Sequence, residues 1–182
     1  MIALSHRTVL GLVLLFAGAA AGAVAGAARA QAADPRAERG KYLVEFGGCN
    51  DCHTPGHFIG HDDTSRYLGG SDVGFAIPGE GVFVGPNLTP DKATGLGNWT
   101  AEQIATAITT GVRPDGRILA PVMPWRGFSH LTHADALAIA EYLKSLPPVA
   151  HKVPGPFGPS QKPDTLVMVV VPPGVYLGLP KP

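Results

Sequence analysis

Residues 48–54 read Gly-Cys-Asn-Asp-Cys-His-Thr, and this short stretch decides more about the fold than any other part of the chain. Cys49 and Cys52 are the only cysteines among 182 residues, and they lie three positions apart. His53 follows directly after the second thiol. Two thiols and one imidazole are therefore concentrated within five residues, and we expect the chemistry of the protein to be centred on them.

The spacing Cys-x-x-Cys-His is the attachment signature of c-type haem. Two thiols at this spacing can add to the two vinyl groups of one porphyrin, and the adjacent imidazole of His53 then binds the iron. A thioredoxin-type disulfide between Cys49 and Cys52 is one alternative, but the βαβ pattern that accompanies it is missing. A zinc site is another alternative, with His57 and His61 as further ligands, but the gap between the cysteine pair and the histidine pair is shorter than in a zinc finger. The sequence favours one covalent haem c over both.

The N-terminal segment has the layout of a secretory signal peptide. Arg7 supplies a positive charge, residues 8–28 are apolar or small, and two small-x-small cleavage sites end at Ala30 and Ala32. We expect residues 1–32 to be cleaved, which would leave a periplasmic protein that starts near Ala33. An uncleaved membrane anchor is the alternative, because about 20 apolar residues suffice to span a bilayer.

The composition is that of one globular domain with many ordered loops. Hydrophobic residues make up 45% of the chain, whereas 24 glycines and 18 prolines argue against a protein that is mostly helix. The 14 basic and 14 acidic residues give no net charge and no basic run, so nucleic acid is excluded as a partner. We expect a cytochrome-like domain over residues 33–148 and a Pro-rich C-terminal extension over residues 149–182.

Capping signals predict three helices in the expected domain. Asp34-Pro35 opens a helix over residues 36–46, Thr100 and Gln103 form a capping box for a helix that Gly111 ends, and Thr132 caps a helix over residues 134–146. The expected buried face of the last helix is formed by Leu137, Ala140, Leu143 and Leu146. Residues 54–85 show no helical period, and residues 73–84 resemble a small hairpin or an ordered loop.

Met123 is the best candidate for a sixth iron ligand. It lies in a loop between Pro121 and Pro124, and apart from Met1 the chain has only one other methionine, Met168. A thioether ligand favours Fe(II) and raises the reduction potential. The alternatives are that Met123 fills a gap in the core, or that the ligand is one of His57, His61, His130, His133, His151 and Met168.

These residues together resemble the class I monohaem c-type cytochromes, and more closely the cytochrome domains that serve periplasmic dehydrogenases for alcohols, aldehydes or sugar acids. The similarity covers about residues 34–148. It is carried by Gly40-Lys41-Tyr42-Leu43, Gly48-Cys49-Asn50-Asp51-Cys52-His53-Thr54, Gly85-Pro86-Asn87-Leu88-Thr89-Pro90-Asp91, Gly111-Val112-Arg113-Pro114-Asp115-Gly116-Arg117, Met123-Pro124-Trp125 and Ala140-Glu141-Tyr142-Leu143.

The resemblance implies an all-α cytochrome c fold, with three to four short helices around one haem, a long loop insertion after the haem motif and an extended tail. It also implies that the Pro86 carbonyl accepts a hydrogen bond from His53, and that Met123 is the distal ligand. Gly40 and Tyr142 resemble the pair at which the first and last helices cross. Trp99 and Trp125 are either haem-edge or propionate contacts, or ordinary core residues.

The expected function is that of an electron carrier rather than an enzyme. The chain has no acid–base pair or nucleophile motif, so the haem would carry the redox chemistry. The expected donor is a periplasmic dehydrogenase, and the expected acceptor is a downstream cytochrome or terminal oxidase of the respiratory chain. Two alternatives are a tightly bound haem subunit of a dehydrogenase complex and a haem enzyme with a labile sixth ligand.

Overall fold

The computed structural model describes residues 34–180. The expected signal peptide, residues 1–32, lies outside the described residues. In chain order, the elements are α1 (Pro35–Phe46), α2 (Cys49–His53), the 3₁₀ turns η1 (His57–Ile59) and η2 (Thr64–Arg66), β1 (Val73–Ile77), β2 (Gly81–Val84), α3 (Ala101–Thr110), α4 (Trp125–Phe128), α5 (His133–Ser145), β3 (Leu166–Met168) and α6 (Pro173–Leu177). Across residues 34–180, no helix is both long and apolar enough to cross a membrane.

The three helices expected from capping signals are present. Asp34 caps α1 by accepting a hydrogen bond from the Arg36 N–H, and the capping box between Thr100 and Gln103 is formed in both directions at α3. Gly111 ends α3 with φ +75°, a conformation that favours glycine. Thr132 caps α5, which begins one residue before the expected position. These local signals are sufficient because each cap satisfies backbone groups that the helix leaves without a partner.

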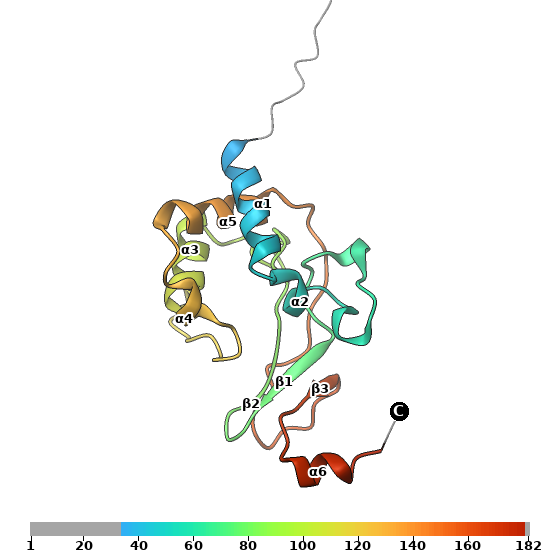
Figure 1. Ribbon diagram of the computed structural model, residues 1–182. Helices are drawn as coiled ribbons and strands as arrows, with labels where there is room; N and C mark the ends of the chain where they lie inside the picture. Colours follow the sequence, from blue (N-terminus) through green and yellow to red (C-terminus); the bar gives the residue numbers. More distant parts are fainter. Residues whose placement is uncertain (1–33, 181–182) are drawn as a thin grey trace, which may run out of the picture. The chain divides into compact units, whose positions relative to one another are not determined.

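Helix α1 packs against α5 (Figure 1), and Gly40 lies at their closest approach. A Cβ atom at Gly40 would lie 1.9 Å from the backbone oxygen of Ala138 and 2.8 Å from Cβ of Tyr142, so only glycine allows this approach. The crossing of the first and last helices that the resemblance implied is therefore confirmed. Arg39 and Asp135 pair beside it at 2.8 Å.

The core lies between α1, α3 and α5. Its buried cluster consists of Val44, Leu68, Leu96, Ile104, Ile139, Ala140 and Leu143. The expected face of α5 is only partly correct, because Ile139 is buried whereas Leu137 is half-buried. The reason is that α5 packs against both α1 and α3, which widens its buried face beyond one stripe.

The expectation of an all-α fold is wrong in one respect. Strands β1 and β2 form an antiparallel hairpin with Phe75 opposite Phe83, and β3 adds to β1 in parallel with Gly74 opposite Val167. The hairpin within residues 73–84 was one of the two expected forms, but its pairing with the tail could not be derived from local pattern. The result is a three-stranded sheet in the order β2-β1-β3 that joins the insertion to the C-terminal extension (Figure 1).

The helices α2, α4 and α6 were not predicted. They have four or five residues each, which is too short to display a helical period in the sequence. Helix α2 matters most, because it contains the whole Cys-x-x-Cys-His motif. Gly48 precedes it with φ +64°, and this left-handed residue turns the chain from α1 into α2.

Candidate haem-binding site

Helix α2 presents two free thiols and one buried imidazole. Cys49 and Cys52 are free and half-buried, whereas His53 is 5% exposed. Burial raises the pKa of the Cys49 thiol to about 11. Burial, assisted by the carboxylate of Asp51, also raises the pKa of Cys52. Both groups are therefore neutral thiols near pH 7, unlike the low-pKa thiolates of disulfide exchange proteins.

The imidazole of His53 is oriented by the backbone of Pro86. The distance between Nδ1 of His53 and the Pro86 carbonyl oxygen is 2.7 Å. A carbonyl oxygen can only accept a hydrogen bond, so Nδ1 must be protonated and act as the donor. The lone pair on Nε2 is then available to bind an iron. Burial lowers the pKa of His53, against the opposing effect of the Pro86 hydrogen bond, and so favours the neutral ring that a metal requires.

Gly85 holds this turn close to α2. A Cβ atom at Gly85 would lie 1.7 Å from the backbone oxygen of Cys52 and 3.4 Å from Nδ1 of His53. The backbone of residues 85–86 therefore packs directly on the haem motif, and any larger residue at Gly85 would push the Pro86 carbonyl away. The predicted contact between His53 and Pro86 is present in the structure for this reason.

Met123 lies half-buried in the loop before α4. Its N–H donates to the carbonyl of Ala120 at 3.0 Å, and its own carbonyl accepts from the N–H of Trp125 at 2.8 Å. These contacts fix the backbone of the loop on both sides of the methionine. They are confined to the loop, and the role of Met123 as an iron ligand stays a prediction.

Several of the alternative histidine ligands are engaged elsewhere. His57 lies 3.1 Å from Asp62 and 3.6 Å from Asp51, His133 pairs with Glu102 at 3.5 Å, and His151 contacts the Gly69 carbonyl at 2.7 Å. Met168 belongs to β3. Within residues 34–180, no group of three or more His, Cys, Asp or Glu side chains has the arrangement of a metal site. The four ligands of the zinc alternative therefore do not converge in this part of the chain.

Two buried side-chain nitrogen atoms have no hydrogen-bond partner within residues 34–180. They are Nε1 of Trp125 and Nε of Arg113, and the latter has only a longer ion-pair contact of 3.4 Å with Asp115. Both are donors, and buried donors without partners fit the carboxylates of haem propionates. The residues present therefore fit a haem in three respects: the two free thiols, the open Nε2 of His53 and these unpaired donors.

The two tryptophans have different surroundings. The ring of Trp125 lies against the backbone of Gly111, where a Cβ atom would approach it to 2.7 Å. Trp99 instead packs on the core cluster, and the guanidinium of Arg113 lies 5.2 Å from the centre of its ring. Sequence reasoning assigned no role to Arg113, although it lies in one of the segments that carry the resemblance. No periodic pattern marks such a residue.

This arrangement of a Cys-x-x-Cys-His helix, a Gly-Pro turn on its histidine and a crossing of the first and last helices defines a c-type cytochrome domain. The family model for cytochrome c matches residues 37–147, more than half of the chain. The chain therefore belongs to the cytochrome c family, whose members carry covalent haem c and transfer electrons.

Relatives of the chain include cytochrome subunits of dehydrogenases. It is 32% identical over 157 residues to the cytochrome c subunit of the quinone alcohol dehydrogenase of Gluconacetobacter polyoxogenes, covering 84% of this chain and 30% of the relative. It is 36% identical over 115 residues to the fructose dehydrogenase cytochrome subunit of Gluconobacter japonicus (63% and 22%). It is 41% identical over 120 residues to a diheme cytochrome c-type protein of Cereibacter sphaeroides (63% and 37%). The chain thus spans between 22% and 37% of the length of these relatives.

Proposed function

We propose that this protein is a periplasmic one-electron carrier with a single haem c, attached through Cys49 and Cys52 and ligated by His53 and Met123. The observation that carries the proposal is the 2.7 Å contact from His53 to the Pro86 carbonyl beside two free thiols. This contact leaves Nε2 of the buried, neutral His53 imidazole available at the place where the covalent cofactor would be attached.

Attachment needs no oxidant and no leaving group. Each thiol would add its sulfur and its hydrogen across one vinyl double bond, which forms a thioether. The raised pKa of Cys49 keeps its thiol protonated near pH 7, which disfavours exchange with other disulfides. When bound, the haem supplies the reversible Fe(II)/Fe(III) couple.

The protein would set the potential through its two ligands and their surroundings. The Pro86 carbonyl increases the basicity of His53, which favours the ferric state, whereas a thioether from Met123 favours the ferrous state. Nε1 of Trp125 and Nε of Arg113 would donate hydrogen bonds to propionates and so stabilise negative charge at the haem edge.

The donor in this proposal is a dehydrogenase, and the acceptor is a downstream cytochrome or terminal oxidase. The support is that two relatives are named as cytochrome subunits of alcohol and fructose dehydrogenases. The chain itself would not catalyse substrate oxidation. A haem enzyme with a labile sixth ligand is the competing function, and it requires that Met123 does not bind the iron.

A fixed subunit of a dehydrogenase complex is a second candidate, which a specific surface favours. We define the C-terminal apolar surface by its exposed large side chains, which are Leu166, Met168, Val169, Val170, Val175, Tyr176, Leu177 and Leu179. Residues 165–180 contain no charged side chain. Such a surface is typical of permanent subunit interfaces, and it lacks the Lys and Arg residues with which peripheral helices bind lipid headgroups.

Replacement of Met123 tests the proposed ligation. Met123→Ala should lower the reduction potential, abolish the long-wavelength Met–Fe(III) absorption band and open the iron to small ligands such as imidazole or cyanide. Met168→Ala is the matched control, because the other methionine of the described chain belongs to β3 and should leave all three properties unchanged. An unchanged potential and spectrum in Met123→Ala would remove Met123 from the site and favour the haem enzyme.

Co-purification tests the second candidate. Val170 is 96% exposed and Leu177 is 75% exposed, so Val170→Asp and Leu177→Asp should leave the fold intact. If the surface binds a larger subunit permanently, both variants should release it during gel filtration, whereas Ile59→Asp, at an exposed position outside the surface, should not. A wild-type protein that elutes alone from its native host would identify a diffusing carrier instead.

A further inference from the structure

One buried amide connects the C-terminal extension to the turn that faces His53. Asn87 is 1% exposed. Its Nδ2 donates to the carbonyls of Val149 at 2.7 Å and His151 at 3.3 Å, and to Oγ1 of Thr94 at 3.1 Å. Its Oδ1 accepts from both the N–H and the hydroxyl of Thr89. Every polar atom of this side chain is therefore engaged, and two of its partners are backbone groups beyond the cytochrome c match, which ends at residue 147.

The position of Asn87 gives these contacts a consequence at the iron ligand. The carbonyl oxygen that accepts from His53 belongs to the peptide group that links Pro86 to Asn87. Rotation of this peptide changes the backbone angle φ of Asn87, and the five hydrogen bonds of the Asn87 side chain oppose any accompanying movement of the residue. An anchored Asn87 therefore restricts the directions in which the Pro86 carbonyl can point.

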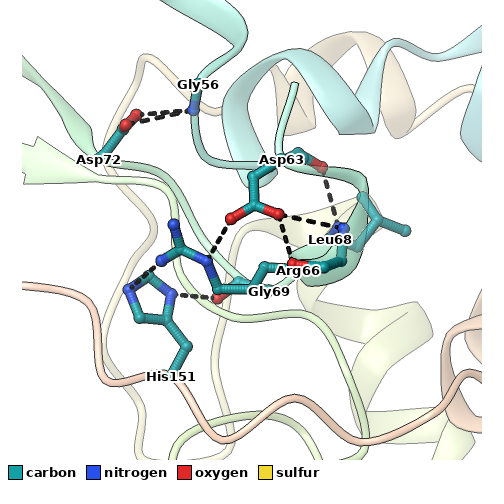
Figure 2. A network of polar contacts seen from close by, with 9 residues as sticks. Gly56, Asp63, Arg66, Leu68, Gly69, Asp72 and His151 are labelled. Carbon is teal, nitrogen blue, oxygen red and sulfur yellow. Dashed lines mark hydrogen bonds and ion pairs between the residues drawn. The ribbon is translucent and has the colours of Figure 1, made fainter. Parts of the chain in front are cut away.

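The extension closes over the same region by a second route. His151 donates from Nδ1 to the carbonyl of Gly69 at 2.7 Å, and its Nε2 lies 3.4 Å from the guanidinium of Arg66. Figure 2 shows His151 between these two groups, with the carboxylate of Asp63 on the other side of Arg66. Gly70, which follows Gly69 in the chain, donates its N–H to the backbone carbonyl of His53 at 2.8 Å. The extension is thus linked to the backbone of His53 through Gly69 and Gly70, and to the Pro86 turn through Asn87.

We propose that Asn87 is a positioning residue through which the C-terminal extension holds the Pro86 carbonyl against His53 and thereby sets the reduction potential. The inference rests on the proposed function, because it needs an iron on His53. It extends that function by making residues 149–151, which lie outside the family domain, part of the proximal side of the haem site.

The sign of the effect follows from the chemistry of the hydrogen bond. A carbonyl that accepts from Nδ1 makes the imidazole a stronger donor to the metal, and a stronger donor stabilises Fe(III) more than Fe(II). A Pro86 carbonyl that is free to turn away would weaken this bond. The ferrous state would then be stabilised relative to the ferric state, and the reduction potential would rise.

Asn87→Ala in the full-length holoprotein is the primary test. It removes the contacts to Val149 and His151, and Asn98→Ala is the matched control, because Asn98 donates a comparable bond of 2.8 Å to Lys92 at an exposed site. At the wild-type midpoint, we expect Asn87→Ala to raise the ratio of reduced to oxidised protein at least about threefold, which corresponds to ~28 mV at 59 mV per tenfold change. Nitrogen-15 NMR should also show faster exchange of the His53 Nδ1–H.

His151→Ala is the second variant, and it keeps the proposal testable if Asn87→Ala fails to fold or to take up haem. It removes the contacts of the His151 side chain to Gly69 and Arg66 but keeps the His151 carbonyl that accepts from Asn87, so it should shift the potential in the same direction by a smaller factor. The inference is overturned if haem-loaded variants keep the wild-type potential and Nδ1–H exchange, or if the potential falls. A wild-type protein that carries no haem would instead overturn the proposed function, before either variant is measured.

Discussion

The helical core and the region formed by the insertion and the extension are held together by different forces. Helices α1, α3 and α5 bury aliphatic side chains in one cluster. Residues 54–87 and 149–168, called the polar region below, contribute Leu68 to this cluster but are joined to each other by a small sheet and by side chains that bond to distant backbone groups, such as Asn87 to Val149 and Thr165 to Asp72. The polar region contains Pro86, whose carbonyl accepts from His53, so strand pairing and side-chain hydrogen bonds hold the backbone that orients the proposed iron ligand.

The largest effect should come from the helix crossing. Gly40→Ala would place a methyl group 1.9 Å from a backbone oxygen of α5, and a backbone atom cannot turn aside as a flexible side chain can. We expect α1 and α5 to separate and the free energy of unfolding to fall by about 3 kcal/mol or more. Urea denaturation of the holoprotein measures this loss.

Gly127→Ala is the control for this substitution, since a Cβ atom there would have no neighbour within 4 Å. It should change the free energy of unfolding by less than about 1 kcal/mol. Equal losses in the two variants would show that the crossing is not the feature on which the core depends.

A smaller and local effect is expected in the polar region. The half-buried hydroxyl of Thr165 donates to the carbonyl of Asp72 at 2.6 Å, beside the pairing of β1 with β3. Thr165→Val should weaken this attachment by about 1 kcal/mol. Hydrogen exchange should accelerate in β3 and remain unchanged in α5.

Thr109→Val removes a hydroxyl that bonds within its own helix, to the carbonyl of Ala105, and serves as the control. It should leave exchange in β3 at the wild-type rate. If Thr165→Val accelerated exchange in α5 as much as in β3, the two regions would unfold as one unit and the contrast between them would fail.

The smallest effect is a pH dependence at Asp63. Hydrogen bonds from Ser65 and the guanidinium of Arg66 lower the pKa of Asp63 to about 2. Because the pKa in the folded protein lies below the ordinary value of about 4, this stabilisation is complete above pH 4 and is lost as the pH falls toward 2. Asp63→Asn should therefore show a smaller decrease of the urea midpoint between pH 5 and pH 3 than the wild type. Identical decreases in the two proteins would contradict this.

The difference between the two regions also explains what the sequence could predict. Caps at Asp34, Thr100 and Thr132 are local, and so is the spacing of Cys49, Cys52 and His53, so the helices and the haem motif were accessible from neighbouring residues. The parallel pairing of β1 with β3 joins segments about 90 residues apart and leaves no local signal. The bonds of Asn87 to Val149 and His151 are equally invisible, because they use backbone carbonyls, which every residue has.

The contact between Pro86 and His53 is a mixed case. It was expected only from resemblance to the cytochromes, since nothing in the spacing of residues 53 and 86 indicates it. The structure supplies the physical reason, which is that Gly85 brings the turn into contact with the Cys52 carbonyl. For Met123 the situation is reversed. Its position between two prolines and the scarcity of methionine predict an iron ligand from the sequence, whereas the structure fixes only the backbone of its loop.

The most direct test of the central claim is the intact mass of the protein under denaturing conditions, after expression with c-type haem attachment machinery. We predict the mass of a chain that starts near Ala33 plus one haem, and the loss of that haem in the double variant Cys49→Ala, Cys52→Ala. A wild-type mass without haem would contradict the account, and a disulfide between Cys49 and Cys52 or a zinc site would then have to be tested in its place.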